Sequence, residues 1–497
     1  MELEEKPLGP TCLPFSKQQD PDNVNFHKSI VSNSSSKFIR YLIPLMLVTG
    51  SGMQSYANGT IDALIVAFLL LSVGLSALIF LFQNMRPERR AFVLTYSVCV
   101  LAGGIAQCYS LAVFNNPQST DDALHTFFPL ISAQPPFMTM ENMPSHNSPL
   151  AVVAWQQVYK LAWGLGLEFG PYTGVMFNAF VMGLVGSFTV RIAREFFGND
   201  THRLQFVGTL FAFNGLFILF GAVLIRDCFT IALNTLVLWG IVRWLIRQTW
   251  WNLLIAVFLM GISTYAMTYL RIQSVLLFGL YGFLAFLFWF FSKRLDAIRL
   301  IAILFAVGLA AIALPYLFTY FHITQETQTR GMEQYAEQSL NASVDDSLGM
   351  RLIVNQPLPI RLVMGSGVLM IYPIPLWAYF NTNFKDYLWI KGYNGIYQLF
   401  VIPLGIVGFS IVFRQLKKDR RQIALLFLAV YLLINMVAVV ATSLEQRHYA
   451  QFMPAFIILA ALPNTQNVMV KQRLRTIVVW WWLVVILVHI TWVVLKW

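Results

Sequence analysis

The chain has 497 residues, of which 57% are hydrophobic and only 11% are charged, with a formal net charge of +11. Soluble domains carry about 25% charged residues, so the composition excludes a string of soluble domains and predicts an all-α, polytopic integral membrane protein. The basic residues stand in short loops between apolar runs, as orientation signals do. The positive charge therefore gives no indication of a nucleic-acid partner.

Residues 1–37 are polar, contain prolines and a serine run, and lack the charged and apolar regions of a cleavable signal peptide. We expect them to form a disordered cytoplasmic tail. The four cysteines do not have the spacing of a metal site or a CxxC pair, and three lie in or beside apolar runs, which argues against a disulfide framework.

About thirteen apolar segments are long enough to cross roughly 30 Å of hydrocarbon. They are 38–57, 61–82, 91–114, 172–193, 204–224, 226–246, 250–270, 272–292, 300–320, 394–414, 422–443, 447–463 and 475–495. Arginines and lysines concentrate in every second loop, including 86–90, 191–203, 243–247, 293–299, 414–421 and 471–475. The positive-inside rule makes these loops cytoplasmic. The amino terminus is then predicted inside and the carboxyl terminus outside.

Two further apolar segments, 150–167 and 361–380, would break this alternation if they crossed the membrane. The second would also place the basic run 414–421 outside. We therefore expect both to be interfacial or re-entrant segments on the outer face. The outer layer is predicted to consist mainly of loop 115–171 and segment 321–393.

The first large outer loop carries Asp121 and Asp122 side by side, just beyond the end of a span. Neighbouring carboxylates can abstract a proton from an acceptor hydroxyl or bind a divalent cation such as Mg²⁺ or Mn²⁺. The alternative is an ordinary loop turn that caps a short helix. His125, Glu141 and His146 lie in the same loop and could join a metal site, but their spacing is irregular.

Isolated charges mark the predicted outer ends of later spans. Arg226-Asp227 stands between two apolar runs, either as a functional pair or as a local ion pair at the interface. Arg271 is a lone cation on the side where cations are scarce, where it could bind a lipid phosphate or extend towards water. Arg447 can donate two parallel hydrogen bonds to an anion or pair with Glu445.

Three further residues are candidates for the acceptor side of a site. His448 and Tyr449 follow Arg447, and Lys160 lies in the middle of segment 150–167. A lysine in an interfacial helix more often reaches towards water than contacts a substrate. The chain contains no P-loop, GxSxG or HExxH motif.

The order of these features resembles the GT-C superfamily of polyprenyl-phosphate-dependent glycosyltransferases, and is most similar to the protein O-mannosyltransferases and the lipid A aminoarabinose transferases. Five elements, spread over about 90–463, carry the resemblance. They are Asp121-Asp122 followed by Phe127-Phe128, then His146 to Leu150, Arg191 to Gly198, Arg226-Asp227, and Arg447-His448-Tyr449 with Pro454 to Ala461. The chain departs from the family in having Asp122 for the usual Glu, Ser148 for the first Pro, and two spans before the catalytic loop.

The resemblance implies a catalytic membrane core at 91–320, preceded by two extra helices at 38–90 and followed by the outer segment 321–393 and the helices of 394–497. It implies Asp121 as the general base, with Asp122 and Asp227 as further catalytic candidates. Arg226, Arg271 and Arg447 would hold the phosphate of a polyprenyl-phosphate-linked sugar. The acceptor would be a glycan, lipid or protein at the outer face of a bacterial inner membrane.

Two other functions fit the same residues. A polysaccharide polymerase of the O-antigen type, using undecaprenyl-diphosphate-linked repeats, would need similar acids and arginines. A transporter or lipid flippase would instead need polar residues that continue from Asp227 through the bundle.

Overall fold

The computed structural model describes residues 25–82, 85–117, 127–132, 148–271, 273–291, 301, 308, 356–371, 374, 376–377, 380, 388–414, 419–442, 446–463 and 467–496. The chain divides into two compact units, Met1–Leu45 and Met46–Trp497. Among the described residues the secondary structure is all helical, which confirms the predicted class. Helix α1 (Asn25–Asn58) begins inside the segment expected to be a disordered tail.

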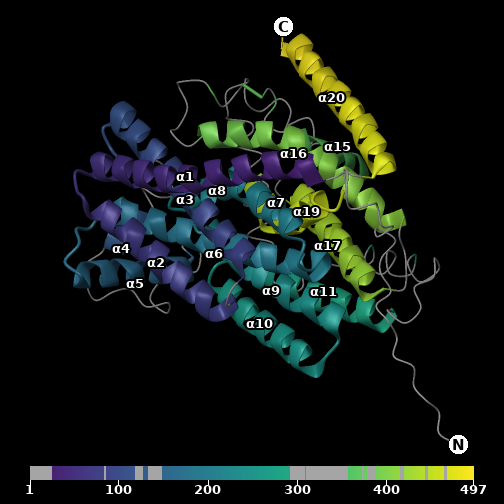
Figure 1. Ribbon diagram of the computed structural model, residues 1–497, viewed down its shortest axis with the longest axis horizontal. Helices are drawn as coiled ribbons and strands as arrows, with labels where there is room; N and C mark the ends of the chain where they lie inside the picture. The colour runs from purple at the N-terminus through teal and green to yellow at the C-terminus, as the bar shows by residue number, and fades with distance from the viewer. Residues whose placement is uncertain are drawn as a thin grey trace, which may run out of the picture. The chain divides into compact units, whose positions relative to one another are not determined.

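Figure 1 shows the helices that follow α1. In chain order they are α2 (Asp62–Phe82), α3 (Arg86–Phe114), α4 (Phe128–Ser132), α5 (Pro149–Gly164), α6 (Pro171–Phe197), α7 (Thr201–Ala212), α8 (Gly215–Ala222), α9 (Asp227–Arg247), α10 (Trp250–Thr268), α11 (Gln273–Phe291), α15 (Leu358–Ile371), α16 (Leu388–Arg414), α17 (Arg420–Thr442), α18 (Gln446–Tyr449), the 3₁₀ turn η5 (Ala450–Phe452), α19 (Met453–Ala460) and α20 (Val468–Lys496).

Eight of the described helices are long and apolar enough to cross a membrane: α2, α3, α6, α9, α10, α16, α17 and α20. The pair α7 and α8 makes a ninth if it is counted as one bent span. The predicted span 300–320 lies almost entirely outside the described residues. The described part of the chain therefore supports an integral membrane protein, while the total of thirteen spans stays a prediction.

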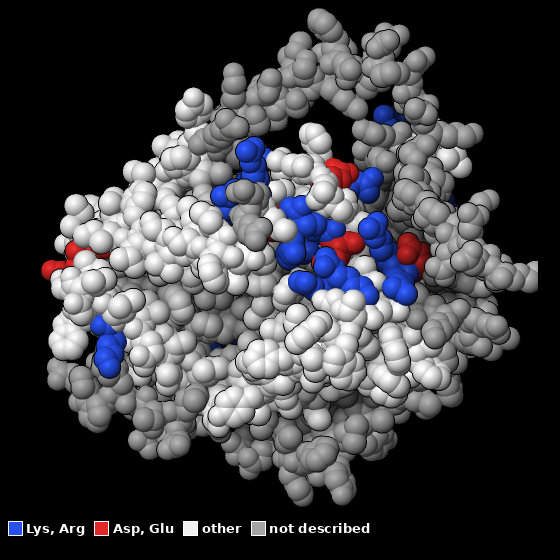
Figure 2. Space-filling view, turned by 60° about the horizontal axis from the view of Figure 1, so that its bottom comes forward, with Lys and Arg blue, Asp and Glu red and all other residues white. Residues whose placement is uncertain are grey.

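Figure 2 shows that most charged side chains on one face of the molecule gather near its centre, where basic and acidic residues lie together, while one acidic and one basic patch lie apart from them at the left. The described surface between these groups is uncharged. Such a surface is expected where side chains face lipid and charges are costly.

The centre of the bundle is the pairing of α3 with α6, and both also pack against α7 and α8. Small residues permit this close approach, as is common between membrane helices. A Cβ added at Gly183 of α6 would lie 2.8 Å from the ring of Phe92 in α3 and 3.2 Å from its carbonyl oxygen. A side chain larger than hydrogen therefore cannot be accommodated there without moving the ring or a helix.

The segment expected as one span at 204–224 is two helices, α7 and α8, bent by 58°. Asn214 causes the break, because its side-chain oxygen accepts hydrogen bonds from the backbone N–H groups of Leu216 and Phe217 at 3.1 and 3.2 Å. These bonds cap the start of α8. The predicted span 447–463 is also divided, into α18, η5 and α19, and Arg447 and His448 lie in the short first helix, α18.

Candidate functional site

Three of the arginines expected to bind a phosphate lie near His448. Arg226 immediately precedes α9, and Arg271 follows the end of α10. Arg447 and His448 are in the short helix α18. We call these four residues and Asp227 the His448 cluster. The cluster thus joins helix ends that are more than two hundred residues apart in the sequence.

Arg271 and Asp227 form a long ion pair at the cluster. The Arg271 Nη1 atom lies 3.8 Å from Asp227 Oδ1, and their side chains are 13% and 5% exposed. This distance exceeds that of a charge-assisted hydrogen bond, which is about 2.7–2.9 Å. Asp227 also occupies the first turn of α9, where the helix dipole stabilises a negative charge. The pair is therefore close enough for attraction without locking the guanidinium in one position.

Arg226 is oriented by Ser148, to whose hydroxyl its Nη1 atom donates. The Ser148 hydroxyl in turn donates to the carbonyl oxygen of Leu270 at 3.2 Å. The backbone N–H of Leu150 donates to the carbonyl of Tyr269 at 3.4 Å. These contacts attach the start of α5 to the end of α10, directly beside Arg271.

Ser148 holds this position with an unusual backbone conformation. Its φ is 54°, in the left-handed region, and the residue is fully buried. A non-glycine residue in that region costs free energy, of the order of 1–3 kcal/mol. The surrounding structure therefore enforces this turn at the residue that contacts Arg226.

The side chain of His448 is half-buried in α18, outside the helices long enough to cross a membrane. Burial lowers its pKa well below the usual value, and the nearby positive charges of Arg271, Arg447 and Arg226 lower it further. His448 is therefore neutral at pH 7 and can donate or accept a hydrogen bond. The combined action of three arginines on one ring shows that their charges converge at this place.

Polar residues extend from Asp227 into the bundle for about two turns. Thr230 donates to the carbonyl of Asp227 at 2.8 Å, and Asn234 donates to Gln451 Oε1 at 3.2 Å. Thr235 is the last of them, and α9 then continues with buried Val237, Leu238, Ile241 and Val242. The polar stretch covers about 12 Å of helix at 1.5 Å per residue. On α9 it ends well before the far end of the helix.

Phe127, the first described residue after Asp121 and Asp122, lies near the cluster. It packs against Trp155 of α5 with ring centroids 5.1 Å apart. Trp155 packs in turn against Phe229, two residues after Asp227, at 5.5 Å. Trp155 is fixed by a 2.8 Å hydrogen bond to Asn178. Phe127, six residues after Asp121, therefore lies close to the start of α9.

The remaining predicted site residues lie outside the His448 cluster or outside the described residues. Lys160 is exposed on α5, and Tyr449 is buried in α18. Asp121, Asp122, His125, Glu141 and His146 all lie outside the described residues. Within the described ranges, no group of three or more His, Cys, Asp or Glu side chains is placed to hold a metal ion. A divalent cation at the acidic loop stays a prediction.

Sequence reasoning missed three polar residues near predicted outer ends. Ser148 contacts Arg226, and Gln451 contacts Asn234. Arg361 is buried in α15 and donates from Nε to the carbonyl of Val440 at 3.1 Å. Arg361 could have been found from the sequence, because it is a charged residue at the start of the predicted re-entrant segment 361–380. Ser148 and Gln451 carry no charge, and nothing in the sequence distinguishes them from other polar residues.

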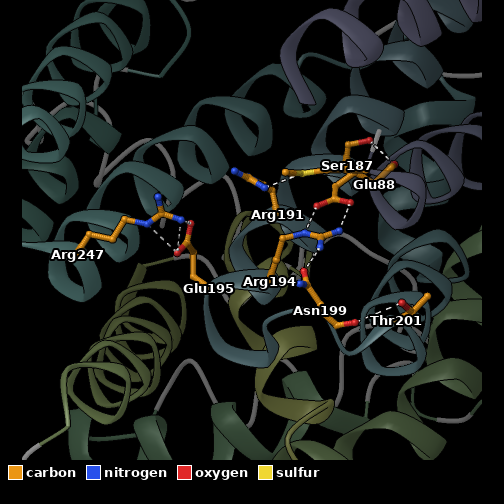
Figure 3. A network of polar contacts seen from close by, with 9 residues as sticks. Glu88, Ser187, Arg191, Arg194, Glu195, Asn199, Thr201 and Arg247 are labelled. Atoms are coloured by element: carbon orange, nitrogen blue, oxygen red, sulfur yellow. Dashed lines mark hydrogen bonds and ion pairs between the residues drawn. The ribbon is translucent and has the colours of Figure 1, made fainter. Parts of the chain in front are cut away.

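A second group of charges lies at the other end of α9, about 24 Å from Asp227 at 1.5 Å per residue. We call it the Glu88 network, and it consists of Glu88, Arg191, Arg194, Glu195, Arg243 and Arg247. Figure 3 shows its two ion pairs. Glu88 is fully buried and accepts two hydrogen bonds of 2.7 Å from Arg194, and Arg247 donates to Glu195 at 3.0 Å. Here each carboxylate has an arginine from another helix.

Comparisons of the chain with protein-family models, with curated proteins and with solved structures found no match.

Proposed function

We propose that the protein is a membrane glycosyltransferase of the GT-C type, which transfers a sugar from a polyprenyl-phosphate-linked donor to an acceptor hydroxyl on the outer face. The observation that carries this proposal is the convergence of Arg226, Arg271 and Arg447 around a neutral His448. The charges of these three half-buried guanidinium groups all act on the His448 ring, so an anion placed beside that ring would be attracted by several cations at once. A phosphate fits because guanidinium groups bind it through paired hydrogen bonds.

The depth of the cluster suits a lipid-linked donor. Its residues lie at the ends of apolar helices, so a phosphate bound there could keep its polyprenyl chain in the hydrocarbon. Asp121 is six residues before Phe127, and six extended residues span at most about 20 Å. Because Phe127 is packed against Trp155 near α9, Asp121 is within reach of the cluster. In this proposal Asp121 removes the proton of the acceptor hydroxyl, which displaces the phosphate at the anomeric carbon with inversion.

The polar stretch on α9 favours this enzyme over a transporter or flippase. A translocation path needs polar residues along the whole thickness of the bundle. Beyond Thr235 the buried face of α9 is apolar as far as Val242. A polymerase that uses polyprenyl-diphosphate-linked repeats would need a similar site. A test with monophosphate-linked and diphosphate-linked donors would distinguish the transferase from the polymerase.

The test is binding of a polyprenyl phosphate to the full chain in detergent. Loss of one charge-assisted hydrogen bond costs about 1.5–3 kcal/mol, which weakens binding roughly 10–150-fold. We expect this loss for Arg271→Ala and for Arg447→Ala, and partial recovery for the lysine variants, because lysine lacks the planar fork.

Arg203→Ala is the matched control, since Arg203 pairs with Asp200 on an exposed surface at 3.3 Å. It should bind the lipid as the wild type does. Normal binding by both cluster variants, combined with a lower unfolding temperature, would assign these arginines to structural ion pairs and refute the proposed function.

A further inference from the structure

Two arginines of the Glu88 network differ from the other two in their partners. Arg194 and Arg247 each donate to a carboxylate, whereas Arg191 and Arg243 form no ion pair with any carboxylate of the described residues. Figure 3 shows Arg191 lying between the Glu88–Arg194 and Glu195–Arg247 pairs, with its guanidinium directed to neither carboxylate. The other contacts of Arg191 and Arg243 therefore determine whether these two guanidinium groups can bind a ligand.

The guanidinium of Arg191 has weak acceptors. Its Nη1 atom donates to the thioether sulfur of Met85 at 2.7 Å, and it lies over the ring of Phe82 at 5.6 Å. A thioether is a poor hydrogen-bond acceptor. The Nε atom of Arg191 is buried and has no acceptor among the described residues. A buried charged donor without an acceptor is costly, so this group is available to a ligand.

Arg243 is held in a similar way by neutral groups. Its Nε atom donates to the side-chain oxygen of Asn252 at 2.8 Å, and the guanidinium lies 5.3 Å from the centroid of the Trp239 ring. These contacts fix the direction of the side chain. Glu195 attracts the guanidinium only from a distance and forms its ion pair with Arg247 instead.

A row of aromatic rings connects the two arginines. Phe82 packs edge-on against Phe188 at 5.3 Å, and Phe188 packs edge-on against Trp239 at 5.7 Å. Arg191 lies over the first ring of the row and Arg243 over the last. The two arginines are also close enough for their charges to act on each other. This row holds two half-buried cations near each other at the ends of three apolar helices, α2, α6 and α9.

We propose that Arg191 and Arg243 together bind a phosphate group, and that this phosphate belongs to the head group of an anionic phospholipid. Basic pockets between membrane helices bind such head groups. The ring faces support the guanidinium groups near the ends of apolar helices, and the apolar surfaces of α2 and α10 beside them remain exposed. Arg194 and Arg247 are already neutralised by Glu88 and Glu195. This inference is independent of the proposed transferase activity.

Native mass spectrometry of the full chain in detergent can test the proposal with three probes: phosphatidylglycerol, phosphatidylcholine and soluble glycerol phosphate. We expect the wild type to retain phosphatidylglycerol preferentially. Arg191→Gln and Arg243→Gln should each weaken its binding about tenfold or more, the effect of one charge-assisted hydrogen bond. Arg191→Lys should lose less, because it keeps the charge. If soluble glycerol phosphate binds as well as phosphatidylglycerol, and the same variants abolish its binding, the site binds free phosphate and the assignment to a phospholipid is wrong.

Arg203→Gln is the control, because Arg203 also lies over an aromatic ring, that of Phe197 at 5.5 Å, but is paired with Asp200. It should leave phosphatidylglycerol binding unchanged. The unfolding temperature of each variant is also measured, so that binding is compared only between folded proteins. Should Arg191→Lys and Arg243→Gln melt like the wild type and bind all three probes as it does, the proposal is wrong. Equal retention of phosphatidylcholine and phosphatidylglycerol by the wild type would also overturn it.

Discussion

The two charged groups at the ends of α9 use arginine in opposite ways. In the Glu88 network, Arg194 makes two hydrogen bonds of 2.7 Å to a carboxylate that is fully buried. In the His448 cluster, the ion pair of Arg271 with Asp227 is 3.8 Å long, and Arg226 donates to a neutral hydroxyl. The first arrangement fixes helices to each other. The second brings guanidinium groups from three helix ends near one histidine, with a longer ion pair and a neutral acceptor.

This difference explains why similar residues in one chain should respond differently to mutation. An arginine whose carboxylate partner is buried contributes to stability, since removal of either member leaves an uncompensated charge. An arginine that is positioned by a hydroxyl or a distant carboxylate contributes mainly to binding. Mutations at the two ends of α9 should therefore separate stability from activity.

Asp121→Asn should have the largest effect on activity. Removal of a general base typically lowers the rate about 10²–10⁴-fold. Asparagine has nearly the same size and shape as aspartate, so we expect little change in the unfolding temperature. The measurement is transfer of sugar from a polyprenyl-phosphate-linked donor, with Asp122→Asn as the milder companion. Near-normal turnover of Asp121→Asn would refute its role as base.

Glu88→Gln should have the largest effect on stability. It leaves Arg194 without its carboxylate in a buried position, where breaking a buried pair costs about 3–5 kcal/mol. The measurement is thermal or chemical unfolding in detergent. The variant that removes both charges, Glu88→Gln with Arg194→Gln, should recover part of the loss. If the single variant unfolds like the wild type, the Glu88 network does not hold the helices together.

His448 should make stability depend on pH. Burial and the neighbouring Arg271, Arg447 and Arg226 lower its pKa in the folded protein well below the usual 6.5. Between these two pKa values the unfolded chain binds a proton that the folded chain does not. Stability is therefore fully present above about pH 6.5 and falls as the pH drops, by at most about 1.4 kcal/mol per pH unit.

The measurement is unfolding of the wild type and of His448→Gln at pH 7.5 and at pH 5.5. The difference between the two proteins isolates the histidine from carboxylates that titrate in the same range. The wild type should lose more stability on acidification than the variant. Equal losses would show that His448 is protonated in the folded protein.

Arg203→Ala should have the smallest effect. Its ion pair with Asp200 is exposed, at 29% and 42% of the side chains, and exposed pairs contribute about 0–1 kcal/mol. We expect a change of less than about 0.5 kcal/mol in unfolding and no change in donor binding. A large loss would mean that arginines on this side are sensitive to mutation whether or not their partners are buried.

The sequence alone predicted the helical class and eight apolar helices that are long enough to cross a membrane, because apolar length is a local property. The total of thirteen spans stays a prediction. It also selected Arg226, Arg271 and Arg447 as unusual cations. It could not predict that they meet at His448, since hydropathy says nothing about which helix ends are neighbours. The break at Asn214 was visible as an Asn-Gly pair, a common turn signal. The backbone of Ser148 was not, because no property of serine indicates a left-handed residue.

The most direct test of the central claim is a structure of the full chain with a bound polyprenyl phosphate. We expect the phosphate to lie within hydrogen-bond distance of at least two of Arg226, Arg271 and Arg447, with the lipid chain leaving between apolar helices. A phosphate bound elsewhere, with all three arginines paired to carboxylates of the chain itself, would contradict the assignment of the His448 cluster as the donor site.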